Sequence, residues 1–112
     1  MRKLLIILLL ASFATSIYAD EYLVIPIAAD VSAADHPTVS RCNGAIAQWA
    51  SQYNPLTIDT QLTGPVTSEA DGSKTAQLAV KIEYARQGGV EPRAATINCI
   101  VKADGSVEVA PA

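Results

Sequence analysis

The sequence is poor in the side chains that most catalytic sites use. It has one histidine, two cysteines and no C-x-x-C spacing. A hydrolytic triad needs a histidine between a nucleophile and an acid, and the one histidine, His36, lies where we expect a helix to begin. The acidic residues are dispersed, and no glycine-rich loop leads from a strand into a helix. We therefore expect no enzyme, no catalytic residue, no metal and no cofactor.

Positive charge and long apolar runs are also scarce. Eight lysines and arginines stand against 11 acidic residues, giving a formal net charge of −3. Nucleic-acid binding needs a basic surface, so we expect no nucleic-acid partner. A membrane-spanning helix needs about 20 apolar residues, whereas the one apolar run, residues 4–13, has about half that length. We expect no membrane insertion of the mature chain.

The first 19 residues have the pattern of an export signal. A basic start is followed by the apolar run and then by a short segment of small and polar residues that ends at Ala19. Cleavage after Ser16 is the alternative. The remaining residues, 20–112, are predicted to form a single small exported domain, periplasmic or secreted. Loss of the two basic residues of the signal lowers its formal net charge to −5.

Export changes the interpretation of Cys42 and Cys99. In an oxidising compartment two thiols persist as a disulfide, and two cysteines allow only one internal pairing. Closing this loop of 57 residues removes about 4 kcal/mol of unfolded-chain entropy. A structural disulfide is therefore the prediction.

One amphipathic helix is predicted over residues 37–53. Asp35 or His36 lies near its cap, Pro37 is in the first turn, and Asn54-Pro55 ends it. Six side chains fall within an arc of about 100° and are predicted to pack on the core. They are Val39, Cys42, Ile46, Trp49, Ala50 and Tyr53.

The strands are predicted from alternation and from turn residues. Residues 23–27 are predicted to form a first strand at a sheet edge, since Pro26 cannot donate to a ladder. The tetrad Ala-Asp-Gly-Ser occurs twice, at 70–73 and 103–106, and predicts two hairpins. Three-residue loops match the apolar faces best and bring together the pairs Leu62 with Val80, Val101 with Val107, and Cys99 with Val109.

This register sorts the strands into two faces. The predicted inner face contains Leu56, Ile58, Leu62, Ala76, Leu78, Val80, Ile82, Tyr84, Ala95, Ile97, Cys99 and Val101. The opposite face is polar and solvated. Cys99 then points toward the helix, and so does Cys42. The predicted fold is α+β: one N-terminal helix on a four- to five-stranded antiparallel sheet, with a single helix-to-sheet disulfide.

The order of one strand, a helix and four antiparallel strands resembles the cystatin-like topology. The inhibitory cystatins carry a Q-x-V-x-G hairpin and a Pro-Trp pair between later strands. The corresponding hairpins here read Ser68-Glu69-Ala70-Asp71-Gly72 and Lys102-Ala103-Asp104-Gly105. The resemblance is therefore one of element order, and it implies no binding residue.

Two surfaces are candidates for binding a partner. The first is a helix face of small residues, and its alternative is an ordinary solvated face. The second is a predicted loop over residues 86–93, and its alternative is a plain flexible connection. The candidate residues are Ser40, Gly44, Ala47, Gln48 and Ser51 on the helix, and Arg86, Gln87, Gly88, Gly89, Val90 and Arg93 in the loop.

Together these features predict a small, exported, non-enzymatic binding module. Its expected partner is another exported or envelope protein, with an inhibitor or immunity-type protein as one form of the hypothesis. The alternatives are a structural or accessory subunit of a cell-envelope assembly, and a small-ligand carrier. The small core counts against the carrier, whereas a cavity of several hundred Å³ between helix and sheet would favour it.

Overall fold

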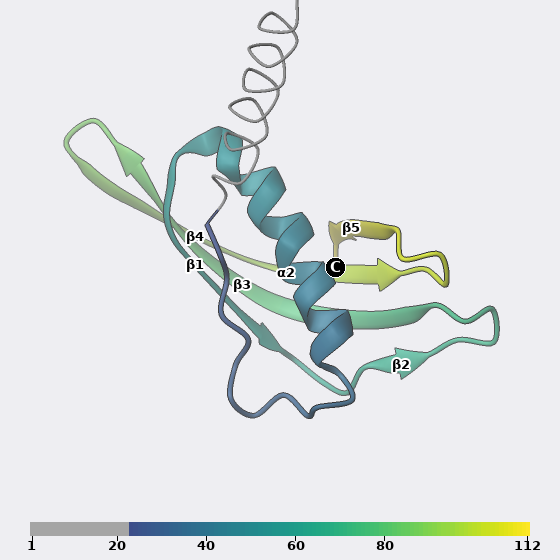
Figure 1. The fold of residues 1–112 in the computed structure, drawn as a ribbon. Coiled ribbons are helices and arrows are strands. Elements are labelled where there is room, and N and C mark those ends of the chain that lie inside the picture. Colours follow the sequence, from purple (N-terminus) through teal and green to yellow (C-terminus); the bar gives the residue numbers. More distant parts are fainter. Residues whose placement is uncertain (1–22) are drawn as a thin grey trace, which may run out of the picture.

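The computed structural model describes residues 23–112, so the predicted export signal lies outside the described residues. Helix α2 (His36–Ala50) crosses one face of a five-stranded antiparallel sheet (Figure 1). The sheet path is β1-β3-β4-β5, and β2 also pairs with β3. The strands are β1 (Pro55–Leu62), β2 (Thr67–Ser68), β3 (Lys74–Arg86), β4 (Gly89–Val101) and β5 (Val107–Pro111). The predicted α+β class is confirmed.

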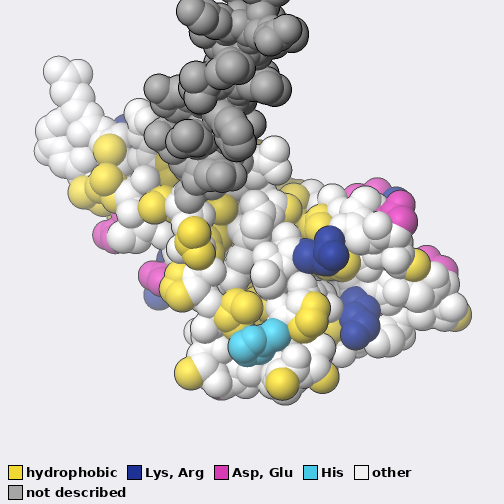
Figure 2. Space-filling view, in the orientation of Figure 1, with side chains coloured by type: hydrophobic (Ala, Val, Ile, Leu, Met, Phe, Trp, Pro, Cys, Tyr) yellow, Lys and Arg dark blue, Asp and Glu magenta, His cyan; other side chains and the backbone are white. Residues whose placement is uncertain are grey.

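Helix α2 begins and ends where the sequence indicates. Asp35 is the residue before its first turn, and Pro37 stands in that turn, where its missing N–H costs no hydrogen bond. The one histidine is exposed at this end (Figure 2). The last predicted turn tightens into a short 3₁₀ helix, η2 (Ser51–Tyr53). Asn54 follows with φ 57°, a left-handed conformation that asparagine tolerates, and the chain turns into β1.

The predicted disulfide joins α2 to β4. Cys42 and Cys99 are bonded with Cα atoms 6.0 Å apart, and both residues are fully buried. Leu78 of β3 is also fully buried and belongs to the same core. The bond therefore fixes the first half of the helix against the centre of the sheet.

The prediction of a strand over residues 23–27 is wrong. The segment is irregular, and the fifth strand of the sheet is β2 instead. Ile25 is only 6% exposed and belongs to the core, while Val24 beside it is almost fully exposed. This segment is thus held by one buried side chain rather than by a ladder, in keeping with the missing donor of Pro26.

One of the predicted registers is correct and one is displaced. Val101 faces Val107 and Cys99 faces Val109, as predicted. Leu62, however, faces Leu78 and not Val80. The turn at 70–73 does have the expected register, with Thr67 opposite Thr75, but residues 63–66 interrupt the ladder between β1 and β2. The displacement is two residues, so Leu62 stays on the inner face.

The inner face is otherwise close to the prediction. Ile58, Ala76, Val80 and Ile82 are buried in one core cluster with the disulfide. Two predicted members are exposed: Leu56, and Ala95 in β4. The β1–β3 register shifts between Pro55 and Thr57, and this irregularity at Leu56 turns its side chain out of the core.

The predicted loop over residues 86–93 is wrong. Arg86 pairs directly with Gly89 across a two-residue turn, Gln87-Gly88, and the rest of the segment belongs to β4. Gly88 has φ 90°, which the turn requires and which glycine adopts at little cost. Strands β3 and β4 therefore form a long two-stranded ribbon that projects past the other strands (Figure 1).

The buried stripe of α2 is rotated relative to the prediction. Trp49 is 52% exposed and Tyr53 44%, whereas Asn43 and Ala47 are buried. One flank of the helix is covered because the Thr60 hydroxyl of β1 donates to Asn43 Oδ1 at 2.6 Å and Ile25 joins the same core cluster as Ala47. No comparable contact from the described residues covers the flank with Trp49.

Candidate functional site

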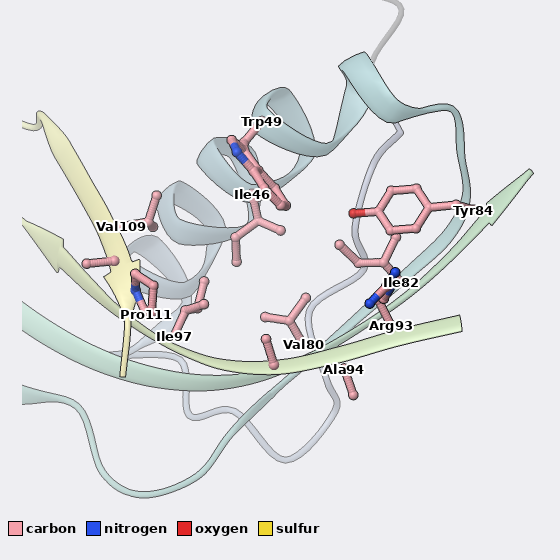
Figure 3. Close-up of a pocket in the computed structure, with 12 residues that line it drawn as sticks. Ile46, Trp49, Val80, Ile82, Tyr84, Arg93, Ala94, Ile97, Val109 and Pro111 are labelled. Carbon is pink, nitrogen blue, oxygen red and sulfur yellow. The ribbon is translucent and has the colours of Figure 1, made fainter. Parts of the chain in front are cut away.

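A groove of about 400 Å³ lies between the second half of α2 and the inner face of the sheet (Figure 3). Almost all of its lining is apolar. It is formed by Ile46, Trp49, Val80, Ile82, Tyr84, Arg93, Ala94, Ala95, Ile97, Val109, Ala110 and Pro111. The groove therefore draws on the helix, on the two long strands and on the end of β5.

Three local features keep this space open. Trp49 projects from the helix over the groove while half of its surface remains in contact with solvent (Figure 3). Below it, β4 contributes Ala95, whose methyl group fills little of the layer between helix and sheet. β5 ends at Pro111, so no further strand among residues 23–112 closes the side of the groove beside Ala94.

Aromatic rings form one wall at the open end. The Trp49 and Tyr53 ring centroids are 5.4 Å apart, and Tyr53 meets Tyr84 edge-on at 6.2 Å. On the other side of Tyr84, the Arg86 guanidinium lies 4.9 Å from the ring centroid. Such edge and cation–π contacts hold the Tyr84 ring in a defined orientation.

Tyr84 is the polar group most clearly directed into the groove. The residue is 6% exposed, and its hydroxyl points toward the groove in Figure 3. The residues of the described chain, 23–112, include no hydrogen-bond partner for this oxygen. Burial is the main cause that raises the pKa of Tyr84 above its ordinary value of 10.0. The hydroxyl is thus neutral near pH 7 and free to donate a hydrogen bond.

Three charged side chains on the ribbon lie beside Tyr84. Arg86 Nε and Glu91 Oε1 are 2.8 Å apart, and Arg93 Nη2 and Glu91 Oε2 are 2.6 Å apart. The Arg93 hydrogen bond is the main cause that holds the pKa of Glu91 below its usual range. Two cations share one anion here, so this end of the groove carries a net positive charge in an acidic protein.

The predicted helix surface is only partly a surface. Ser40, Gly44 and Gln48 are exposed, and a Cβ added at Gly44 would meet nothing within 4 Å. Ser51 is half-buried. Ala47 is 4% exposed, so its placement on the outer face is wrong; it belongs to the core cluster that Ile25 also joins.

The predicted loop residues lie at the tip of the ribbon, and only one of them reaches the groove. Gln87, Gly88, Gly89 and Val90 are exposed at or beside the turn. Arg93 lines the groove because it lies on the inner face of β4, opposite Ile82. The structure therefore does not gather the predicted residues into one site.

The sequence did not reveal the groove, since periodicity assigned Trp49 to core packing. A signal was present in the inner-face pattern, which changes from large residues to Ala95 on the strand below the second half of the helix. A large aromatic residue above a small one leaves space in a layer that must otherwise close-pack.

A second pocket of about 400 Å³ lies against the polar face of the sheet, where Asp59, Lys81 and Glu83 are among its lining residues. Residues 23–112 contain no group of three potential metal ligands. No helix within them is long and apolar enough to span a membrane. Comparison with known proteins gives no further guide, because no family model, curated protein or solved structure matches this chain.

Proposed function

We propose that the protein binds a small amphipathic ligand in the groove between α2 and the sheet. The observation that carries the proposal is the apolar groove of about 400 Å³ with the Tyr84 hydroxyl directed into it, a hydroxyl for which residues 23–112 supply no hydrogen-bond partner. Small-molecule sites are typically concave, apolar and about 300–1,000 Å³ in volume, with few polar groups that orient the ligand. This is the carrier function, without enzymatic chemistry.

The disulfide supports an exported setting for this function. A buried cystine that joins helix and sheet persists in an oxidising compartment, the periplasm or the exterior of the cell. The export signal at residues 1–19 is part of the same proposal.

The groove can be tested with the only tryptophan of the chain. Trp49 lies over the groove, so an apolar probe such as N-phenylnaphthylamine should change Trp49 emission and itself become fluorescent on binding. The matched variants are Ala95→Phe, which fills the groove, and Thr96→Phe, which puts the same ring on the opposite face. We expect Ala95→Phe to abolish binding and Thr96→Phe to retain it. Absence of probe binding to the wild-type protein would refute the proposed function.

A macromolecular partner is the second candidate, and the exposed aromatic pair favours it. Trp49 and Tyr53 are both about half exposed at the end of the helix, and aromatic side chains are the commonest anchors of protein interfaces. The test is affinity capture of envelope and culture proteins on the oxidised protein, with the double variant Trp49→Ser, Tyr53→Ser as the control. A saturable partner that the variant loses would support this candidate over the carrier.

A further inference from the structure

Charged side chains are distributed unevenly around the groove. Among residues 23–112, Arg93 is the only basic side chain that lines the groove, and no acidic side chain lines it. Glu91, the nearest acid in the register, is already held by Arg86 and Arg93. A positively charged ligand group in the groove would therefore meet the Arg93 guanidinium without a free carboxylate.

The two donors of this region lie on the same face of the ribbon. Tyr84 is opposite Glu91 and Ile82 is opposite Arg93, so Tyr84 and Arg93 are diagonal neighbours. Diagonal pairs on one face are separated by about 7–8 Å, a gap that long side chains can span toward a common ligand.

Both donors have capacity left for a ligand. Arg93 uses Nε and Nη2 for Glu91, and its side chain is 69% exposed. Its Nη1 has no hydrogen-bond partner within the described chain, and neither does the Tyr84 hydroxyl. One oxygen-rich anion could accept from both groups while an apolar tail occupies the groove.

Resting on the proposed function, we infer that the ligand is an amphiphile with a carboxylate head group, bound by the Tyr84 hydroxyl and the Arg93 guanidinium with its tail under Trp49. The raised pKa of Tyr84 agrees with this, since a neutral phenol donates a hydrogen bond to a carboxylate whereas a phenolate would repel it. Hydrogen bonds between a charged acceptor and these donors are stronger than neutral ones.

The experiment compares three ligands that differ only in the head group. Decanoate, decanol and decylamine are used to displace N-phenylnaphthylamine from the oxidised wild-type protein near neutral pH, below the concentrations at which they form micelles. We expect decanoate to bind about tenfold more tightly than decanol, with decylamine weakest.

Variants assign the preference to the two donors. Tyr84→Phe and Arg93→Gln should each weaken decanoate binding about tenfold and weaken decanol binding much less, because the decanol hydroxyl is a neutral acceptor. Lys81→Gln is the matched control, because it removes one positive charge from an exposed position that does not line the groove.

Each unfavourable outcome has a distinct meaning. Equal binding of decanoate and decanol, tighter binding of decylamine, or equal losses in Arg93→Gln and Lys81→Gln would overturn the carboxylate assignment. Probe binding that none of the three ligands competes with would also overturn it, while the groove would stand as a binding site. Failure of the probe itself to bind would instead refute the proposed function.

Discussion

The two halves of the helix–sheet interface have the same apolar periodicity and different outcomes. In the first half Cys42, Leu78 and Cys99 are fully buried. In the second half Trp49 remains half exposed over a groove. The difference lies beneath the helix: large side chains and a covalent bond fill the first half, and Ala95 underlies the second. An amphipathic stripe thus tells which way side chains point, and the opposite layer decides whether they are buried.

The first half of the interface, which is closed, is also held by a hydrogen bond at its edge. Arg41 Nη1 donates to the Gly105 carbonyl at 3.1 Å and so links the first turns of α2 to the β4–β5 turn. In the second, open half the links lie beyond the end of α2: Arg86 Nη1 donates to the Tyr53 carbonyl at 3.2 Å, and the Ala85 amide donates to the Asn54 carbonyl at 2.9 Å. We therefore expect the largest stability effects in the first half and the largest binding effects in the second.

Removal of the disulfide should produce the largest effect. The double variant Cys42→Ala, Cys99→Ala loses the cross-link over 57 residues and should be destabilised by about 4 kcal/mol. The measurement is urea unfolding followed by circular dichroism, with the reduced wild-type protein as the control. Equal stability of variant and wild type would show that packing alone closes this half.

A pair of truncations compares the two halves directly. Leu78→Ala leaves a cavity in the closed half and should cost about 3 kcal/mol. Trp49→Ala removes a half-exposed side chain and should cost about 1 kcal/mol while weakening probe binding. Unfolding of both variants is followed by circular dichroism, because Trp49→Ala lacks the tryptophan that a fluorescence measurement would need. A larger loss of stability for Trp49→Ala than for Leu78→Ala would contradict the difference between the two halves.

Gly44→Ala should stabilise the helix without affecting the groove. A Cβ at this position meets nothing within 4 Å, and alanine is favoured over glycine in a helix interior by about 1 kcal/mol. Gly105→Ala is the opposite control, because Gly105 has φ 90° and its Cβ would lie 3.1 Å from Arg41 Nη1. Melting temperatures should rise for the first variant and fall for the second. A lower melting temperature for Gly44→Ala would point to a packing role that the structure does not show.

The two Ala-Asp-Gly-Ser turns should produce the smallest effect, visible only in acid. Hydrogen bonds from Ser73 to Asp71 and from Ser106 to Asp104 hold the pKa values of these carboxyls below their ordinary value of 3.8. Their contribution to stability is present above that value and is lost as the pH falls through the lower pKa of the folded protein. The double variant Asp71→Asn, Asp104→Asn should therefore lose less stability than wild type below about pH 4. Parallel thermal-stability profiles across that range would contradict this.

The disulfide was predictable because two independent patterns converge on it. A period of 3.6 turns Cys42 toward the sheet, and a period of two turns Cys99 toward the helix. Turn chemistry likewise predicted the β4–β5 register, where the chain runs uninterrupted from turn to strand. Local signals were sufficient for these two features, whereas the equally local turn at Gln87-Gly88 was predicted as a longer loop.

The groove was not predictable, because it depends on which elements cover each flank of α2. Ile25 and Thr60 cover the flank of Asn43 and Ala47, and neither contact has a local signature. The same limit applies to Leu62, whose register depends on a non-local ladder interrupted by residues 63–66. Arg93 was singled out as a loop residue, although its position on the inner face follows only from the tight turn at Gln87-Gly88.

The exposed edge of β4 has a consequence for self-association. The Ala112 amide donates to the Thr96 carbonyl, so alternate residues of β4 beyond it, including Pro92, present their backbone groups to the same open side. An unprotected strand edge beside an apolar groove would invite a second copy of the chain to extend the sheet. Pro92 has no N–H to offer at that edge, and its ring interrupts the ladder that such an intermolecular sheet would need. Pro92 thus makes this edge of β4 a poor template for a second copy of the chain.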